Sequence, residues 1–487
     1  MSQFDIPKSW NVISFGDLNQ HKSSIVQPDK YSDTVFELYS VPVFFEGKPE
    51  VLIGKEIGSS KQYVESNDVL VCKINPRINR VWIVDEKSEY DQIASSEWIV
   101  MRSDIVNSRY LLRYFQSEQF RTPLCADVTG VGGSLTRAQP KKVATFPIPL
   151  APLAEQQVIA DKLDTLLAQV ESIKARLERI PEILKQFRQS VLAAAVSGKL
   201  TEEWRANKQS KFEIDSLTNE KLSLIKAKLV KKDLHVEVGE EIFDLPEGWE
   251  TLALQSFATK ITDGEHSTPK RESSGHYLLS ARNVRDGFLD LSNVDYVGNE
   301  EFLKLRKRCD PDEGDILISC SGSVGRISLV DRSNEYVMVR SAALVKIMHQ
   351  FLNNKYLMYI LQSPLSQKQI EEKSKSTAQA NLFLSQIKEL SIPCPSIEEQ
   401  MEIVRLIDQR FTVTNSIEQQ VQSALDRVSN LTQSILAKAF RGELTAEWRE
   451  ANPELISGEN SAEALLDRIK TERELAKLAT KRGRGKA

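Results

Sequence analysis

Apolar residues recur at helical spacing in two long stretches of the chain, and this is its most regular pattern. In the first stretch the steps alternate between four and three residues without exception, as in the seam of a coiled coil. The first seam consists of Ile159, Leu163, Leu166, Val170, Ile173, Leu177, Ile180, Leu184, Phe187 and Val191. The second consists of Ile403, Ile407, Ile417, Val421, Ala424, Val428, Leu431 and Ile435. Two long helices are therefore predicted, each with a seam that needs a partner.

The boundaries of these helices also have sequence signals. Ser396 and Glu399 have the spacing of a capping box at the start of the second helix. Gly198 and Gly442 are expected to end the two helices, because glycine adopts the left-handed conformation of a helix C-terminus. Pro181 removes a backbone donor in the middle of the first seam and is expected to kink or restart that helix.

The seams can be satisfied between two copies of the chain or within one chain. Two seams in the same register favour pairing within one chain. The first helix then leaves one domain and leads to the next, while the second helix leaves that second domain. Helices connected in this way must pair antiparallel. The predicted fold class is α+β: two α/β domains separated by two long helices that form an antiparallel coiled coil, with a pseudo-two-fold axis.

The helical stretches belong to a repeat with a spacing of 244 residues. The block 148–157 (IPLAPLAEQQ) returns at 392 as IPCPSIEEQM, and 198–205 (GKLTEEWR) returns at 442 as GELTAEWR. The segments before these blocks match more loosely, as do 6–10 (IPKSW) and 245–249 (LPEGW). A duplicated structural domain without a recognition role is one interpretation. Near-identical helices that alternate with divergent loops favour a recognition role for the variable domains instead. A pure scaffold has no obvious reason to diversify only its loops.

This repeat divides the chain into six segments. We predict a first variable domain (1–147), a central helical region (148–205), a helical linker (206–244), a second variable domain (245–391), a second helical region (392–449) and a helical tail with a basic end (450–487).

Composition and charge narrow the class of protein. No apolar run is long enough to cross a bilayer and the first ten residues have no signal pattern, so a cytoplasmic protein is expected. The five cysteines form no CxxC pair and are expected to be reduced. The net charge of −4 counts mildly against a free-standing DNA-binding protein. Basic residues are nevertheless clustered locally, as at 77–80 and 304–308.

Two predicted strand–loop–strand segments carry side chains of the types that can read DNA bases. In 68–85 the loop holds Lys73, Asn75, Arg77, Asn79 and Arg80. Arginine pairs with guanine and asparagine with adenine, while lysine mainly neutralises phosphate. In 315–331 the corresponding loop is small and flexible, with Ser321, Ser323 and Arg326 as candidates. A third candidate segment combines turn residues with cations: His266, Thr268, Lys270, Arg271, Arg282, Asn283 and Arg285.

The sequence indicates no catalytic motif. The near misses to an amino-methyltransferase tetrad, Asn75-Pro76-Arg77 and Asp310-Pro311-Asp312, lack the second proline and the aromatic ring. There is no GxxxxGK[ST] phosphate loop, and the five histidines do not have zinc-site spacing. Asp85-Glu86-Lys87 with Pro28-Asp29 is too short and poorly spaced to predict a metal nuclease. No catalytic residue, cofactor or metal is predicted in this chain.

These motifs resemble a known family. Residues 148–157, the helix after them and 198–205 resemble the central conserved region of type I restriction-modification specificity subunits. Residues 431–448 and 457–460 resemble the C-terminal conserved region, particularly of enterobacterial type IA systems. The stretches 73–82 (KINPRINRVW) and 263–269 (DGEHSTP) resemble segments of the target-recognition domains.

The resemblance implies that the two variable domains are target-recognition domains, each reading half of a split, asymmetric DNA target. It also implies two methyltransferase subunits carrying S-adenosylmethionine, and restriction subunits, as partners. On this view the first seam, roughly 50 Å long at about 1.5 Å per residue, limits the separation of the half-sites. The alternative is a coiled-coil scaffold that joins proteins without binding DNA.

Overall fold

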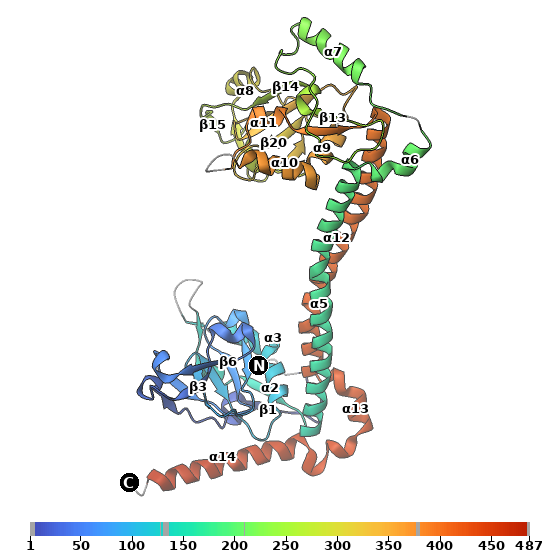
Figure 1. The fold of residues 1–487 in the computed structure, drawn as a ribbon. Helices are drawn as coiled ribbons and strands as arrows, with labels where there is room; N and C mark the ends of the chain where they lie inside the picture. Colours follow the sequence, from blue (N-terminus) through green and yellow to red (C-terminus); the bar gives the residue numbers. More distant parts are fainter. Residues whose placement is uncertain (1–4, 127, 130–135, 209, 376–379, 485–487) are drawn as a thin grey trace. The chain divides into compact units, whose positions relative to one another are not determined.

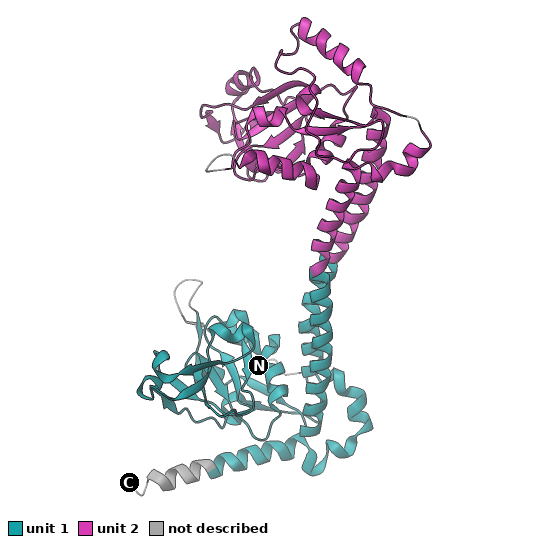
Figure 2. Ribbon diagram, viewed as in Figure 1, with its two compact units in different colours: residues 1–178, 422–487 teal, residues 179–421 magenta. Residues whose placement is uncertain are grey.

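The chain is described here from a computed structural model that covers residues 5–126, 128–129, 136–208, 210–375 and 380–484 (Figure 1). It forms two compact units (Figure 2). Unit 1 comprises Met1–Glu178 and Gln422–Ala487, and unit 2 comprises Arg179–Val421. Each long helix therefore contributes one part to each unit. Among the described helices, none combines the length and the apolar character that a membrane-spanning helix needs.

Unit 1 contains a five-stranded sheet in the order β2-β5-β8-β3-β4, a three-stranded sheet in the order β7-β6-β9, and the strand pairs β1-β12 and β10-β11. Between the described strands of this unit, all pairings are antiparallel except β3 with β8. The strands are β1 (Asn11–Ser14), β2 (Ile25–Val26), β3 (Val35–Tyr39), β4 (Glu50–Ile53), β5 (Lys61–Tyr63), β6 (Val69–Cys72), β7 (Val81–Ile83), β8 (Asp91–Ser95), β9 (Trp98–Met101), β10 (Val128–Thr129), β11 (Arg137–Ala138) and β12 (Pro147–Leu150).

Helices cover the three-stranded sheet of unit 1 and extend its core to the long helices. The helices are α1 (Phe15–Leu18), α2 (Ser108–Gln116), α3 (Glu118–Ala126), α4 (Pro140–Val143), the first part of α5 (Leu153–Val196), the last part of α12 (Ile397–Phe440), α13 (Ala446–Ala451) and α14 (Ala462–Arg484). Helix α2 packs on β6 and β7. One core contains Tyr110 and Tyr114 of α2, Ile159 and Leu163 of α5, and Phe440 of α12.

Unit 2 contains two four-stranded sheets, β14-β23-β20-β21 and β15-β19-β16-β22, and the pairs β13-β24 and β17-β18. The only parallel pairing between its described strands is β16 with β22. The strands are β13 (Glu250–Ala253), β14 (Ala258–Asp263), β15 (Arg271–Glu272), β16 (His276–Leu279), β17 (Val284–Arg285), β18 (Phe288–Leu289), β19 (Asp295–Val297), β20 (Ile316–Ser319), β21 (Ile327–Leu329), β22 (Tyr336–Met338), β23 (Ala342–Ile347) and β24 (Ser391–Cys394).

The helices of unit 2 repeat the arrangement of unit 1. They are the last part of α5, α6 (Glu202–Ala206), α7 (Ile214–Lys226), α8 (Asn299–Arg306), α9 (Asn354–Leu361), α10 (Pro364–Ser374), α11 (Leu384–Lys388) and the first part of α12. Helix α9 corresponds to α2: Asn107 and Asn353 each cap their helix by accepting a hydrogen bond from the backbone three residues on. The largest core of this unit joins β13, β20, β23 and α9 to α5 and α12.

The predicted pairing of the long helices is confirmed within each unit. In unit 2, Arg188 of α5 donates to Glu418 of α12 at 2.6 Å and lies 5.9 Å from the Phe411 ring centre. In unit 1, Ile159, Leu163 and Val170 of α5 share a core with Ile435 and Leu436 of α12. Of the predicted seam, Leu184, Val191 and Val421 are also buried, and Leu166, Leu177, Ile180 and Val428 are half-buried.

Four predicted seam residues are more exposed than a continuous buried seam requires. Ile173, Phe187, Ile417 and Leu431 retain between 37% and 47% of their surface. Away from the globular parts a helix in a two-helix pair has only one neighbour, so the flanks of its seam stay open to solvent. The four residues are therefore at the edge of the pairing surface rather than inside it.

The predicted helix boundaries are largely confirmed. Gly198 and Gly442 follow α5 and α12 with φ of +69° and +74°. Ser396 caps α12 by accepting from the Glu399 amide at 3.3 Å, but the Glu399 side chain does not complete the capping box. The predicted restart at Pro181 is wrong, because α5 runs through this residue as one helix. Pro181 is exposed, which keeps its ring out of the packed interior.

A buried carboxylate at the start of each long helix fastens three segments of its unit. In unit 1, Glu155 has no exposed surface and accepts hydrogen bonds from Trp10 at 2.8 Å and Thr445 at 2.6 Å, and pairs with Arg449. The Arg449 guanidinium also donates to the Gly442 carbonyl at 2.9 Å. Glu155 thereby holds together the segment before β1, the start of α5 and the segment after α12.

Unit 2 contains the same fastening. Glu399 accepts from Trp249 at 3.0 Å, Thr201 at 2.8 Å and Arg205 at 2.6 Å. Arg205 also donates to the Gly198 carbonyl at 3.0 Å. The best-preserved residues of the sequence repeat are therefore structural. They are buried polar groups whose hydrogen bonds must be satisfied, so substitution at them is costly.

The segment predicted as a helical linker (206–244) belongs to unit 2. After Ala206, the end of α6, its described residues form one α-helix, α7 (Ile214–Lys226). Phe212, Leu217, Val230 and Leu234 are buried because they supply apolar surface to that unit.

Candidate nucleic-acid interface

Both predicted strand–loop–strand segments form antiparallel hairpins. In unit 1, β6 pairs with β7, and in unit 2, β20 pairs with β21. The loop of unit 1 turns at Asn75 and Asn79, whose φ values of +47° and +52° are left-handed. Asparagine tolerates this conformation better than most residues. The backbone turn of the unit 1 loop thus determines where Asn75 and Asn79 lie.

The cationic and amide side chains of the unit 1 loop have different roles. Arg80 donates to the Ile74 carbonyl at 2.8 Å, and Asn79 donates to the Gln116 carbonyl at 3.1 Å. These two side chains hold the loop in shape. Arg77 is exposed, and Lys73 and Asn75 are half-exposed. Arg77 and Lys73 are therefore the cations that this loop presents to solvent.

Unit 2 has a polar cleft beside its hairpin. A cavity of about 960 Å³ is lined by the predicted residues His266 and Ser321, together with Asp263, Arg340 and Asn381. A bridge between Ser321 and Asn381 joins the hairpin loop to the segment before α11. The cleft therefore brings together side chains from four separate parts of the second variable domain.

A network at the cleft fixes His266. Asp263 contacts His266 at 2.8 Å and accepts from Arg308 at 2.7 Å. Burial of Asp263 opposes its ionisation, but the hydrogen bonds from Arg308 and His266 outweigh burial, so the pKa of Asp263 is lowered. The carboxylate is therefore charged and orients both partners. The His266 imidazole is thus held at the cleft by Asp263 and Arg308.

The turn that carries His266 is rigid. Glu265 accepts from the backbone amides of His266 and Ser267 at 2.9 and 3.0 Å. The Ser267 hydrogen bonds lower the pKa of Glu265. Gly264 lies against the Met338 carbonyl, where a Cβ atom would collide with the backbone. Any larger residue at this position would push the turn out of place.

Arg340 was missed by the sequence analysis. It is exposed between β22 and β23 and lines the cleft. Its backbone amide donates to the Glu265 carbonyl at 3.1 Å, which ties it to the His266 turn. A lone arginine between two strands has no spacing signal, so only the fold brings it to the cleft.

One predicted contact residue is not available to DNA. Asn283 exposes 1% of its surface; its amide donates to the Asp290 carbonyl at 3.0 Å and its oxygen accepts from Ser280 at 3.0 Å. An asparagine can bind a base edge only if it is exposed, whereas here it satisfies the backbone of a tight turn. Its prediction as a DNA contact is corrected to a structural role.

The remaining predicted residues of unit 2 lie at the surface. Arg271 and Arg282 share Asp295 as an ion-pair partner at 3.1 and 2.9 Å, and Arg285 pairs with Asp290 at 3.3 Å. The other predicted residues are exposed or half-buried: Thr268, Lys270, Ser323 and Arg326. These residues do not line the cleft with His266 and Ser321.

Comparison with known proteins identifies relatives of this architecture. Residues 7–182 and 246–427 match the family described as Type I restriction modification DNA specificity domain. The chain is 43% identical over 329 residues to the type I restriction enzyme EcoBI specificity subunit of Escherichia coli, covering 67% of this chain and 64% of that protein. It is 36% identical over 375 residues to the EcoKI specificity subunit of Escherichia coli K12, covering 76% and 72%.

A solved structure shares the fold. The HsdS subunit from Thermoanaerobacter tengcongensis matches with a TM-score of 0.57 at 19% identity, covering 90% of this chain and 98% of that one. The residues that match the family model include most of both variable domains and much of both long helices. The chain therefore belongs to the type I restriction modification DNA specificity family.

Proposed function

We propose that this chain supplies the DNA sequence specificity of a type I restriction-modification complex. Each unit reads one half of a bipartite, asymmetric target. The observation that carries the proposal is the contrast within the repeat. Glu155 and Glu399 fasten their units with the same set of partners, whereas the loops beside the two hairpins differ in sequence and shape.

The exposed side chains suit base reading. Arg77 in unit 1 and Arg340 in unit 2 are exposed guanidinium groups, which can donate two hydrogen bonds to guanine. Lys73 and Lys270 can neutralise phosphates, which sets position without reading sequence. Because the surroundings of Arg77 and Arg340 are unrelated, the two half-sites are expected to differ.

The proposal extends to the partners. The chain is a non-catalytic subunit that binds double-stranded DNA and scaffolds two methyltransferase subunits and restriction subunits. The related EcoBI and EcoKI proteins are specificity subunits of type I restriction enzymes, which supports this assignment. S-adenosylmethionine is expected on the methyltransferase subunits. The assembled complex is expected in the cytoplasm, associated with DNA.

Exchange of residues 1–147 for another recognition domain tests the proposal. We expect the assembled methyltransferase to modify a target with one half-site altered and the other unchanged, as measured by sequencing methylated adenines. Alteration of both half-sites would reject a separate reading function for each unit. Absence of any sequence-specific protection by the unmodified complex in footprinting would favour the scaffold alternative.

A further inference from the structure

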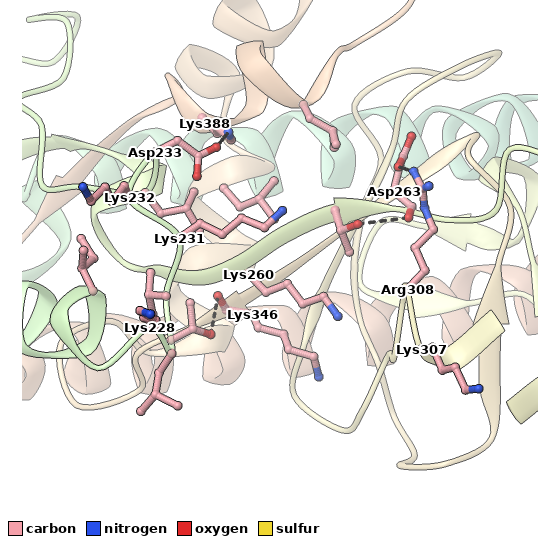
Figure 3. A pocket seen from close by; sticks show the side chains of 18 residues that line it. Lys228, Lys231, Lys232, Asp233, Lys260, Asp263, Lys307, Arg308, Lys346 and Lys388 are labelled. Carbon is pink, nitrogen blue, oxygen red and sulfur yellow. Dashed lines mark hydrogen bonds and ion pairs between the residues drawn. The ribbon is translucent and has the colours of Figure 1, made fainter. Parts of the chain in front are cut away.

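A lysine-rich groove lies in unit 2 beside the polar cleft. It has a volume of about 1090 Å³ and is lined by eight cationic and two acidic side chains (Figure 3). The cationic residues are Lys228, Lys231, Lys232, Lys260, Lys307, Arg308, Lys346 and Lys388. None of the predicted DNA-reading residues lines this groove.

Half of these cations are neutralised and half are not. Lys388 pairs with Asp233 at 2.5 Å, Lys260 with Asp310 at 2.6 Å, Lys346 with Asp315 at 2.6 Å and Arg308 with Asp263 at 2.7 Å. The four remaining lysines are all exposed and have no ion pair with a described acidic residue: Lys228, Lys231, Lys232 and Lys307. The groove thus keeps an excess of positive charge.

The fold holds three of these lysines in place. They follow α7 in a segment that lies along one side of the groove (Figure 3). Val230 and Leu234 of this segment are 5% and 3% exposed, and Lys231 and Lys232 lie between these two anchors. The Lys388–Asp233 ion pair fastens the same segment to the end of α11. A positively charged edge held this firmly suits a fixed, extended anionic ligand.

The groove adjoins the candidate reading cleft. Asp263 and Leu384 line both cavities. Arg308 lines the groove and also contacts His266 in the cleft. A duplex that places base edges at the cleft would therefore carry its neighbouring phosphates along the groove.

Unit 1 has an equivalent groove with a different charge. Its lining residues 469, 472 and 473 correspond to 225, 228 and 229 at the repeat spacing. Glu472 replaces Lys228, and Arg473 is paired with Asp17. This cavity of about 540 Å³ is lined by four acidic residues, Asp17, Glu65, Asp104 and Glu472, and by three cationic ones, Lys22, Arg102 and Arg473. Arg102 and Arg473 are paired with Glu65 and Asp17, so the unit 1 groove has no excess of positive charge for the same ligand.

We propose that the groove of unit 2 binds the phosphates of DNA that flanks the half-site read by this unit, and that unit 1 has no such site. The inference rests on the proposed function. The contact is independent of sequence, because lysine neutralises phosphate without reading bases. The chain therefore makes these flanking phosphate contacts at one end of the DNA target only.

The test uses the assembled complex with its methyltransferase subunits and a duplex that extends beyond both half-sites. The variant is Lys231→Gln, Lys232→Gln and Lys307→Gln together. Loss of three phosphate contacts should reduce the slope of log affinity against log salt by about 2 to 3. Target choice should remain unchanged. Shortening the duplex beyond the unit 2 half-site should reduce the slope for the unaltered complex but not further for the variant.

A matched control replaces Lys304, Lys368 and Lys375 by Gln in the same unit. These lysines are at least 65% exposed in their side chains, and each already pairs with a glutamate of its own helix. The slope should stay close to that of the unaltered complex.

An unchanged slope in the groove variant would overturn the proposal. So would loss of methyltransferase subunits from that variant, which would assign the groove to an acidic protein surface. If the unaltered complex protects no defined DNA sequence in footprinting, the proposed function itself is rejected, whatever the salt slopes of the variants are.

Discussion

Arg205 donates a 2.6 Å hydrogen bond to Glu399, a carboxylate with no exposed surface that lies 194 residues further along the chain. Arg449 pairs with Glu155 in the same way in unit 1. In both units the segment that follows one long helix is bonded to the first turn of the other. This fastening joins distant parts of the chain, so each unit contains residues of both long helices as well as its variable domain.

Replacement of Glu399 by Gln should destabilise unit 2. The amide keeps the shape of the side chain but removes the charge that compensates Arg205, whose side chain is 18% exposed. A hydrogen bond to a charged partner contributes about 1.5 to 3 kcal/mol, so we expect a loss of about 2 to 3 kcal/mol in the free energy of unfolding. Urea unfolding followed by tryptophan fluorescence measures it.

Glu402→Gln is the matched control for that variant. Glu402 is on the same helix and pairs with Arg405 in an exposed contact three residues apart. Surface pairs of this kind contribute less than about 1 kcal/mol. Equal losses of unfolding free energy for the two variants would show that the buried Glu399 contact stabilises unit 2 no more than an exposed ion pair does.

The sequence repeat predicted the helices and their partners but not what the repeated polar residues do. Trp10, Glu155, Thr445 and Arg449 recur at matching positions, yet they are far apart in the chain and no local spacing links them. Polar residues retained in both copies of a repeat are a usable signal for a buried network. The seam spacing, by contrast, predicts helices directly because it depends only on local periodicity.

The glycine after α5 should tolerate no side chain. Gly198 has a φ of +69°, and a Cβ atom there would collide with the Pro246 ring. The left-handed conformation alone costs a non-glycine residue about 1 to 2 kcal/mol. We expect Gly198→Ala to lose more than Gly287→Ala, whose φ is +86° with nothing within 4 Å. Thermal unfolding of both variants isolates the contribution of the proline contact, and equal losses would show that it is negligible.

A buried lysine should make the stability of unit 2 depend on alkaline pH. Lys221 exposes 1% of its surface and donates to the Gln255 and Ala258 carbonyls at 2.9 and 2.5 Å. Burial lowers the pKa of Lys221 from 10.5 to about 8. Between these values the unfolded chain binds more protons than the folded chain, so this residue makes the folded state more stable as pH rises.

Lys221→Leu tests this dependence, because the repeat has Leu465 at the corresponding position of unit 1. Relative to the variant, the unaltered chain should gain up to about 3 kcal/mol of unfolding free energy between about pH 8 and 10.5. Burial also raises the pKa values of Cys309 and Cys320 to about 12, which acts in the opposite direction. That contribution is common to both proteins and cancels in the difference. A difference independent of pH would contradict the prediction.

Residue type alone did not separate contact residues from structural ones. Asn283 and Arg80 have the side chains of base readers, but the fold uses them for backbone hydrogen bonds. His266 and Ser321 were predicted from turn composition and do line the cleft. The difference is the hydrogen bonding of each side chain to the backbone, which depends on tertiary packing and is not encoded in a short motif.

Arg340 and Asn283 should therefore give opposite results on substitution. Arg340→Ala removes an exposed guanidinium from the cleft, so we expect DNA affinity of the assembled complex to fall by about 1 to 3 kcal/mol, with relaxed specificity at one base pair. The melting temperature should be unchanged. Asn283→Ala leaves backbone groups of a buried turn unsatisfied and should lower the melting temperature. Binding titrations and thermal unfolding on both variants distinguish these roles. A stable Arg340→Ala complex with unaltered affinity and target choice would exclude this arginine from DNA recognition.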